Sequence, residues 1–139
     1  MRTVLVFGTF DVIHPGHRFF LKQARGRGDR LVAAIARDAF VAAFKGRRPV
    51  HDENERLRHV LDTGLVDQAL LSDEEPGTYG VIERARPEVI CLGHDQEALR
   101  ANLAAWLQAH GLRIEVETLE ALEPHRYKSS ILNAPRPLR

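Results

Sequence analysis

Two histidines, two glycines and an acidic residue are gathered in one short segment near the start of the chain. Gly8-Thr9-Phe10-Asp11 is followed, after two residues, by His14-Pro15-Gly16-His17. Glycine allows the backbone to approach a ligand closely, and imidazoles offer hydrogen-bond donors. Residue types of this kind, at this spacing, suit the binding of an anion such as a phosphate group.

Two histidines are also common zinc ligands. His14 and His17 are three positions apart across Pro15, and neither a cysteine nor a cluster of acidic residues accompanies them. Zinc sites in proteins need three or four protein ligands. We therefore expect no metal ion to be held by direct protein ligation at this segment.

The elements that must position this segment follow from the apolar pattern. The apolar run Thr3–Phe7, ended by Gly8, predicts a buried strand, and Pro15–Arg25, followed by Gly26, predicts a helix. In a parallel sheet, ligands bind beyond the carboxyl ends of the strands, so residues 8–17 should line a pocket. The N–H groups at the helix start favour an anion there.

The rest of the chain alternates short apolar runs with amphipathic segments. Predicted strands cover 31–35, 66–71, 89–92 and 113–118, and predicted helices cover 38–44, 53–63, 78–85 and 97–110. This alternation is typical of a single α/β domain with a parallel sheet. One face of the longest predicted helix is expected to bury Leu99, Leu103, Ala104 and Leu107.

Length, composition and charge are those of one ordinary globular domain. The 139 residues are 44% hydrophobic and 28% charged, with a net charge of +1. This balance gives no argument for nucleic-acid binding, and no apolar stretch approaches the roughly 20 residues of a membrane span. The one cysteine, Cys91, lies in an apolar run and is predicted to be a buried structural thiol. We expect a cytoplasmic protein without nucleic-acid or membrane partners.

The segment Gly8-Thr9-Phe10-Asp11-x-x-His14-x-Gly16-His17 resembles the HxGH signature of the nucleotidyltransferase superfamily. Within it, the chain is most similar to the small cytidylyltransferases typified by glycerol-3-phosphate cytidylyltransferase. The resemblance continues through Gly28–Val32, Asp38, Glu55-Arg56, Val66-Asp67 and Leu92-Gly93-x-Asp95. It implies a Rossmann-like, doubly wound sheet of five parallel strands in one domain at residues 1–132, usually in a homodimer.

The resemblance implies a reaction in which an acceptor phosphate oxygen attacks the α-phosphorus of a nucleoside triphosphate in line, and pyrophosphate leaves. Such a reaction depends on positioning and on stabilisation of charge. Residues carried over as catalytic are His14, His17 and Lys45. Mg²⁺ is the expected cofactor, because it accompanies triphosphates in such reactions.

Other matched positions are assigned to substrates by the same resemblance. The nucleotide is expected to contact Gly8, Thr9, Phe10, Gly16, Gly93, His94, Asp95, Ser129 and Ser130. Substrate phosphate is expected to contact Asp11, Arg47, Arg56 and Arg126. Asp11 has the alternative roles of serving Mg²⁺ or fixing the loop, and a solvated run of charge is the alternative for the basic loop at 45–51.

The base and the acceptor remain open between alternatives. The Thr9-Phe10-Asp11 run and the basic loop favour CTP, with a small phosphorylated alcohol such as glycerol 3-phosphate, or a phosphonate, as acceptor. Residues 92–96 also resemble FAD synthetases of the archaeal type, so an FMN adenylyltransferase is the first alternative. A catalytically inactive nucleotide-binding regulatory domain is the second, although intact His14, His17 and Lys45 argue against it.

The last seven residues, 133–139, contain two prolines and are predicted to be a tail or a linker to a possible fused C-terminal domain. The many Arg and Ala residues indicate a GC-rich genome. Together these features favour one specific acceptor, 2-hydroxyethylphosphonate, in an antibiotic biosynthesis of the fosfomycin type, where the cytidylyltransferase domain is part of a bifunctional enzyme.

Overall fold

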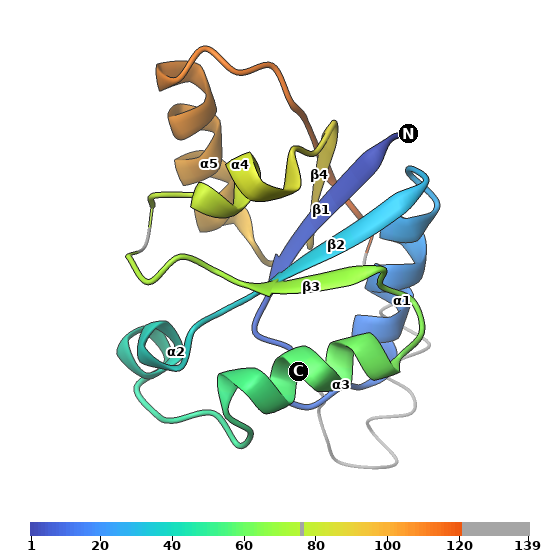
Figure 1. The fold of residues 1–139 in the computed structure, drawn as a ribbon. Coiled ribbons are helices and arrows are strands. Elements are labelled where there is room, and N and C mark those ends of the chain that lie inside the picture. The colour runs from blue at the N-terminus through green and yellow to red at the C-terminus, as the bar shows by residue number, and fades with distance from the viewer. Residues whose placement is uncertain (76, 121–139) are drawn as a thin grey trace.

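The computed structural model describes residues 1–75 and 77–120, and in these ranges one or two helices separate each strand from the next (Figure 1). The strands are β1 (Thr3–Gly8), β2 (Arg30–Ile35), β3 (Gln68–Leu71), β4 (Val89–Leu92) and β5 (Glu115–Thr118). The helices are α1 (Pro15–Arg25), α2 (Asp38–Lys45), α3 (Glu53–Asp62), α4 (Gly80–Ala85) and α5 (Glu97–Ala109). The predicted elements are all present.

The strands form one parallel sheet in the order β3-β2-β1-β4-β5. β1 lies in the middle, and its Val6 is beside Ala33 of β2 on one edge and Cys91 of β4 on the other. The order of the strands reverses at β1, and in open α/β sheets ligands bind in the crevice at such a point, beyond the carboxyl ends of the strands. The predicted Rossmann-like, doubly wound α/β fold is confirmed.

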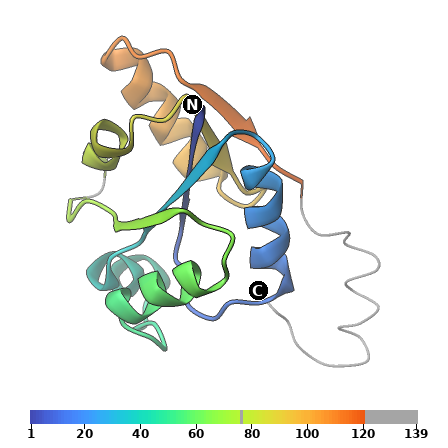
Figure 2. The same cartoon turned by 45° about the vertical axis from the view of Figure 1, so that its right-hand side comes forward.

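The three inner strands, β1, β2 and β4, are almost continuous runs of buried apolar residues. Because successive side chains of a strand point to opposite faces, both faces of the sheet are apolar there. Val6 of β1 belongs to a buried cluster with Leu21 of α1 and Val60 of α3. Leu5 belongs to a second cluster with Leu103 of α5. Thus α1 and α3 cover one face, α4 and α5 cover the other, and α2 lies beyond the carboxyl ends of the strands (Figures 1 and 2).

The buried stripe of α5 differs from the predicted one, because Leu99 is only partly buried and Ala104 is not buried at all. Leu103 and Leu107 are buried as expected, but Ala104 is exposed and Trp106 is partly buried against the second cluster. The prediction for Ala104 was wrong because the stripe extends from Leu103 toward Trp106, three residues on, rather than toward the next residue.

Cys91 is fully buried in β4, and burial raises the pKa of its thiol to about 11. This is the environment predicted for a structural cysteine. Among the helices of the described ranges, none has the length and apolarity that a membrane span needs. The predicted domain boundary at residue 132 and the tail at 133–139 lie outside the described residues.

Candidate active site

The segment between β1 and α1 ends in a helix cap made by two histidines. His14 is the N-cap residue of α1, and its Nδ1 atom accepts a hydrogen bond from the backbone N–H of Gly16 at 3.1 Å. His17 is the third residue of the helix, and its Nδ1 atom accepts from the backbone N–H of His14 at 3.3 Å. This is the reciprocal geometry of a capping box, in which the third residue is usually Glu or Gln.

This cap fixes which ring nitrogen carries the proton. A backbone N–H is always a donor, so the Nδ1 atoms of His14 and His17 must be acceptors. In a neutral imidazole the proton then lies on Nε2. Each ring therefore has an Nε2–H donor, which is the kind of group that a phosphate oxygen accepts a hydrogen bond from.

His17 is neutral near pH 7. Burial lowers its pKa from 6.5 to about 4, and His14 and Lys45 act in the same direction, while the backbone of Val12 and the carboxylate of Asp95 act against it. The cause is that a charged imidazolium loses hydration when it is buried. The same contributions place Lys45, at the end of α2, and Asp95, just before α5, within electrostatic reach of His17.

Phe10 packs behind this cap. The side chain is 3% exposed, and its ring meets the ring of His17 edge to face, with centroids 5.3 Å apart. Its φ of 51° is a left-handed conformation that is uncommon for a residue other than glycine. A Cβ on Gly8 would lie 2.5 Å from the Phe10 ring, and one on Gly16 would lie 2.9 Å from the His14 ring. Both glycines are therefore required by the rings that pack on them.

Asp11 holds the basic loop that follows α2. Its carboxylate accepts hydrogen bonds from the backbone N–H groups of Val50 at 2.7 Å and His51 at 2.9 Å. Lys45 is the exposed last residue of α2, and Gly46 ends that helix with a φ of 71°. Of the roles that the sequence suggests for Asp11, these hydrogen bonds correspond to fixing the loop.

Arg56 is fully buried beneath the same loop. Its guanidinium donates hydrogen bonds to the carbonyl oxygens of Thr9 at 2.8 Å and His51 at 3.0 Å, and to the carboxylate of Asp38 at 2.7 Å. A guanidinium with no exposed surface offers nothing to a substrate phosphate. We therefore expect Arg56 to position the end of β1, the loop and the start of α2, in place of the phosphate contact suggested by the sequence.

Gln96 bridges the two strands at the point where the strand order reverses. Its amide nitrogen donates to the carbonyl oxygen of Phe7, which belongs to β1, at 3.0 Å. Its amide oxygen accepts from the backbone N–H of Gly93, which follows β4, at 2.8 Å. His94 and Asp95 are exposed beside this bridge. The sequence assigned Gly93, His94 and Asp95 to the nucleotide and placed Gln96 with them beside the base, but it did not predict this bridge.

A cavity of about 560 Å³ opens at the carboxyl ends of β1, β2 and β3 and extends to Asp95, Gln96 and α5, which follow β4. Pockets for small molecules typically have volumes of about 300–1,000 Å³. Of the predicted site, Gly8, Thr9 and Asp95 line this cavity. The lining also includes four aromatic side chains, Phe7, Phe40, Phe44 and Tyr79. The site thus combines polar groups at the ends of the strands with an aromatic wall.

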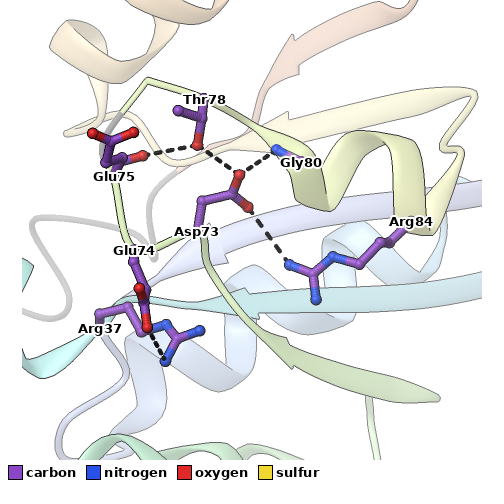
Figure 3. A pocket seen from close by; sticks show the side chains of 7 residues that line it. All are labelled: Arg37, Asp73, Glu74, Glu75, Thr78, Gly80 and Arg84. Atoms are coloured by element: carbon purple, nitrogen blue, oxygen red, sulfur yellow. Dashed lines mark hydrogen bonds and ion pairs between the residues drawn. The ribbon is translucent and has the colours of Figure 1, made fainter.

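A second hollow, open and charged, adjoins the aromatic cavity (Figure 3). Both are lined by Arg37, Asp73 and Glu75. The carboxylate of Asp73 accepts hydrogen bonds from the hydroxyl of Thr78 and the backbone N–H of Gly80, and it lies 3.5 Å from Arg84. Burial alone would raise the pKa of Asp73, but these interactions hold it below its usual value. They fix the segment that carries Tyr79 into the aromatic cavity.

The aromatic wall is the part of the site that sequence reasoning missed. A signal was present, because Phe40 and Phe44 are four residues apart on a short helix whose one buried residue is Val41. Two large apolar side chains at that spacing share one face of a helix.

The other predicted ligands of the substrates lie elsewhere. Arg47 is exposed in the basic loop. Three predicted ligands, Arg126, Ser129 and Ser130, lie outside the described residues and stay predictions.

Comparisons with known proteins show the family to which the chain belongs. Residues 5–133 match the sequence profile of the family described as cytidylyltransferase-like. The FAD synthase of Methanothermobacter thermautotrophicus is 42% identical over 123 residues, which cover 86% of this chain and 80% of that protein. The FAD synthase of Methanosarcina barkeri is 40% identical over 116 residues, which cover 84% of this chain and 81% of that protein.

Solved structures give the same picture of the fold. A protein from Thermoplasma volcanium, described as a lipopolysaccharide core biosynthesis protein, superimposes with a TM-score of 0.80 at 32% identity and covers 88% of this chain and 99% of its own. Pantothenate synthetase from Thermus thermophilus has a TM-score of 0.58 at 16% identity, with 96% of this chain and 66% of its own covered. The second likeness concerns the fold alone.

The relatives correct the expected reaction. Transfer of CMP from CTP to a small phosphate- or phosphonate-bearing alcohol is contradicted, because the proteins that match most of this chain at 40–42% identity are FAD synthases. They agree with the first alternative, an FMN adenylyltransferase. The expected phosphonate acceptor and the place in antibiotic biosynthesis lose their support with it.

Proposed function

Because the chain belongs to the cytidylyltransferase-like family and is a nucleotidyltransferase, we propose that it transfers AMP from ATP to FMN, forming FAD and releasing pyrophosphate. The relatives support this choice of substrates, since they are FAD synthases that span most of the chain. In this reaction ATP takes the place of the expected CTP, and a flavin takes the place of the expected small alcohol. It keeps in-line attack on the α-phosphorus, without a covalent enzyme intermediate.

The observation that carries the proposal is the aromatic cavity lined by Gly8 and Thr9, the first residues of the segment that leads to the histidine cap. The cavity of about 560 Å³ is lined by Phe7, Phe40, Phe44 and Tyr79 at one end of the sheet. A flavin has a large flat ring system whose burial against aromatic side chains stabilises a complex. Glycerol 3-phosphate has almost no apolar surface and would leave such a wall exposed to water.

The reaction would proceed where β1 meets α1. An oxygen of the FMN phosphate forms a bond to the α-phosphorus of ATP, and the bond from that phosphorus to the bridging oxygen of the β-phosphate breaks. Pyrophosphate leaves with the electron pair of that bond. The Nε2–H groups of His14 and His17 would donate to the α-phosphate oxygens, and these donors are already oriented by the cap.

Lys45 would supply a positive charge at the same place. It ends α2 and lies within electrostatic reach of His17, so its ammonium can approach the phosphates that His17 contacts. The dipole of α1 adds a partial positive charge at its N-terminus. Three contributions of the same sign therefore meet where negative charge increases in the transition state.

Mg²⁺ is proposed as part of the substrate, MgATP. Within the described residues, no group of three or more His, Cys, Asp or Glu side chains is placed to share a metal ion. The carboxylate of Asp11 accepts two backbone hydrogen bonds from the basic loop. The phosphates of ATP would therefore supply most of the oxygen ligands that Mg²⁺ prefers.

A matrix of pyrophosphate release tests the proposal. Purified protein is incubated with ATP or CTP against FMN, glycerol 3-phosphate and 2-hydroxyethylphosphonate, and products are separated by chromatography. We expect FAD and pyrophosphate from ATP with FMN, and neither from the pairs with small acceptors. Turnover of CTP with a small acceptor, or no turnover of any pair, would contradict the proposal, and the second outcome would favour an inactive nucleotide-binding domain.

The homodimer implied by the family resemblance stays part of the proposal. Light scattering coupled to size-exclusion chromatography measures it directly. A mass near twice the 15.7 kDa of the chain is expected, and a mass near 15.7 kDa would contradict it.

A further inference from the structure

Phe40 and Phe44 form an exposed aromatic pair on α2. Their ring centroids are 4.4 Å apart, and the ring planes are inclined by 32°. The residues are 37% and 69% exposed, although both line the cavity. Large apolar side chains that meet water inside a concave site mark a surface for a ligand, because the ligand releases that water when it binds.

Other walls of the cavity are made by elements that follow β3 and β4. Tyr79 precedes α4, and Leu99 and Asn102 belong to α5. The hydroxyl of Tyr79 donates to the amide oxygen of Asn102 at 2.6 Å, which orients both side chains. Figures 1 and 2 show α2 on one side of the segment after β3, with α4 and α5 on the other. A flat molecule in this cavity would face an aromatic surface on α2. The polar side chain of Asn102 is part of the same lining.

The helix that carries the pair also carries Lys45, the residue next to Phe44. At its other end, Asp38 accepts hydrogen bonds from the buried Arg56 at 2.7 Å and from the backbone of Glu53 at 3.2 Å. α2 is therefore tied to the loop and to α3 where it begins. A ligand that contacts the middle of α2 and the cation at its end is held by one anchored helix.

We propose that Phe40 and Phe44 bind the planar ring system of the acceptor, and that this contact places the acceptor's phosphate beside Lys45. The inference rests on the proposed function, with FMN as the acceptor. It assigns specificity for a flavin to α2, a helix outside the His14–His17 segment. Binding energy from the ring, which does not react, is then used to orient the group that does.

The adenine ring of ATP is the competing occupant, and the topology favours the flavin. α2 follows β2, whereas Gly93 and Asp95, which we expect beside the base, follow β4 on the opposite side of β1. A triphosphate at the cap of α1, in the middle, would have its base toward β4. Asp95 lines the same cavity, which therefore spans both sides of β1, and its end toward β2, where Phe40 and Phe44 lie, is left for the acceptor.

Variants of the pair test this assignment in the full chain. We compare Phe44→Ala and the double variant Phe40→Ala/Phe44→Ala with Phe44→Trp, which keeps an aromatic surface. Leu112→Ala is the matched control, because Leu112 is 41% exposed and lies after α5, away from the cavity lining. Steady-state rates with varied FMN and varied ATP give separate KM values, and thermal melting reports folding.

We expect the double variant to raise KM for FMN by about 5-fold to 50-fold, the range expected for loss of aromatic stacking. KM for ATP should change less than about twofold, and Phe44→Trp should stay near wild type. Lumiflavin, which has the ring system without the ribityl phosphate, should compete with FMN in the wild type and lose potency about equally in the double variant.

The outcomes separate this inference from the proposed function. If the wild type forms no FAD, the proposed function fails. If it forms FAD while the folded Phe44→Ala variant keeps its KM for FMN, only the assignment to α2 fails. An increase in KM for ATP with an unchanged KM for FMN would also overturn the assignment. It would indicate that Phe40 and Phe44 bind the adenine ring of ATP.

Discussion

The imidazole rings of His14 and His17 are stacked, with centroids 3.8 Å apart and planes inclined by 20°. The stack explains the spacing of the motif, because an N-cap residue and the third helical residue are the two positions whose side chains meet in a capping box. Pro15 fits the first helical position, where its missing N–H needs no partner. One local arrangement thus ends the loop, starts α1 and orients two donors.

Replacing His14 by Asn should separate the cap from the chemistry. Asn is among the best N-cap residues, and its side-chain oxygen can accept from Gly16 as Nδ1 does. The variant keeps the helix start, but its amide N–H groups lie nearer the backbone than the Nε2–H of His14 and do not reach the same position. We expect a melting temperature near that of the wild type and a kcat lower by about 10²-fold to 10³-fold, as for loss of one transition-state donor.

His14→Ala is the comparison for that variant, because it removes both the cap and the donor. Loss of the cap should cost about 1 kcal/mol of stability. The fall in kcat should be similar to that of His14→Asn, because both variants lose the Nε2–H donor. If His14→Asn turned over FMN and ATP at the wild-type rate, His14 would be a structural cap without a part in the reaction.

His17 should make the folded state less stable as the pH falls below 6.5. Its pKa is lowered from 6.5 to about 4 in the folded state, mainly by burial and then by His14. The unfolded chain therefore binds the proton first, and stability is lost between about pH 6.5 and pH 4 but is unaffected by this group above that range. The loss at pH 5 relative to pH 7.5 should be on the order of 1–2 kcal/mol.

Urea unfolding at the two pH values measures this loss, and His17→Asn removes the titrating group while offering an acceptor to the backbone of His14. The difference between wild type and variant isolates His17 from the carboxylates that also titrate in this range. An identical change in the two proteins would mean that His17 is not held neutral by the fold.

The fold could be predicted because each strand and helix is specified locally. Apolar runs ended by Gly8 and Gly93 mark strands with both faces buried, and Gly26 lies where α1 ends. The strands at the edges, β3 and β5, are shorter than predicted. Val66 is buried without being part of β3, so its apolar character reports packing rather than strand pairing.

The site could be predicted only where its residues form one contiguous segment. His14 and His17 could be recognised because a helix cap is local, whereas Arg56 reaches Thr9 across 47 positions of the chain. A sequence shows that Arg56 is charged but not that it is buried. The acceptor was mispredicted for the same reason, since Phe40 and Tyr79 meet in one cavity only after the sheet has formed.

Loss of Arg56 should affect both stability and turnover. Arg56→Met keeps the length of the side chain but leaves the carbonyl oxygens of Thr9 and His51 without their donor. Buried polar groups without partners cost about 1–3 kcal/mol each, so we expect a loss of stability of roughly 2–4 kcal/mol. KM for FMN should also rise, because the start of α2 is no longer held.

Arg56→Lys is the matched variant, because it keeps the charge near Asp38 but cannot reach three acceptors at once. A double-mutant cycle with Asp38→Asn measures the part that belongs to the ion pair, in which the Asp38 side chain is 42% exposed. Wild-type stability of Arg56→Met in urea would show that the buried contacts are not needed to hold the loop.

Gln96 offers a test of the bridge between β1 and β4, because Gln96→Glu changes only one of its two hydrogen bonds. A carboxylate can still accept from the backbone N–H of Gly93, but it cannot donate to the carbonyl oxygen of Phe7, and the two oxygens then repel each other. We expect a loss of about 1–3 kcal/mol in unfolding free energy and a KM for ATP raised about 5-fold to 20-fold, since Asp95 is the neighbouring residue. KM for FMN should rise less than KM for ATP, because Gln96 lines the cavity on the β4 side of β1, whereas Phe40 and Phe44 line it on the β2 side. Equal changes in the two KM values would mean that the nucleotide and the flavin are not bound on opposite sides of β1.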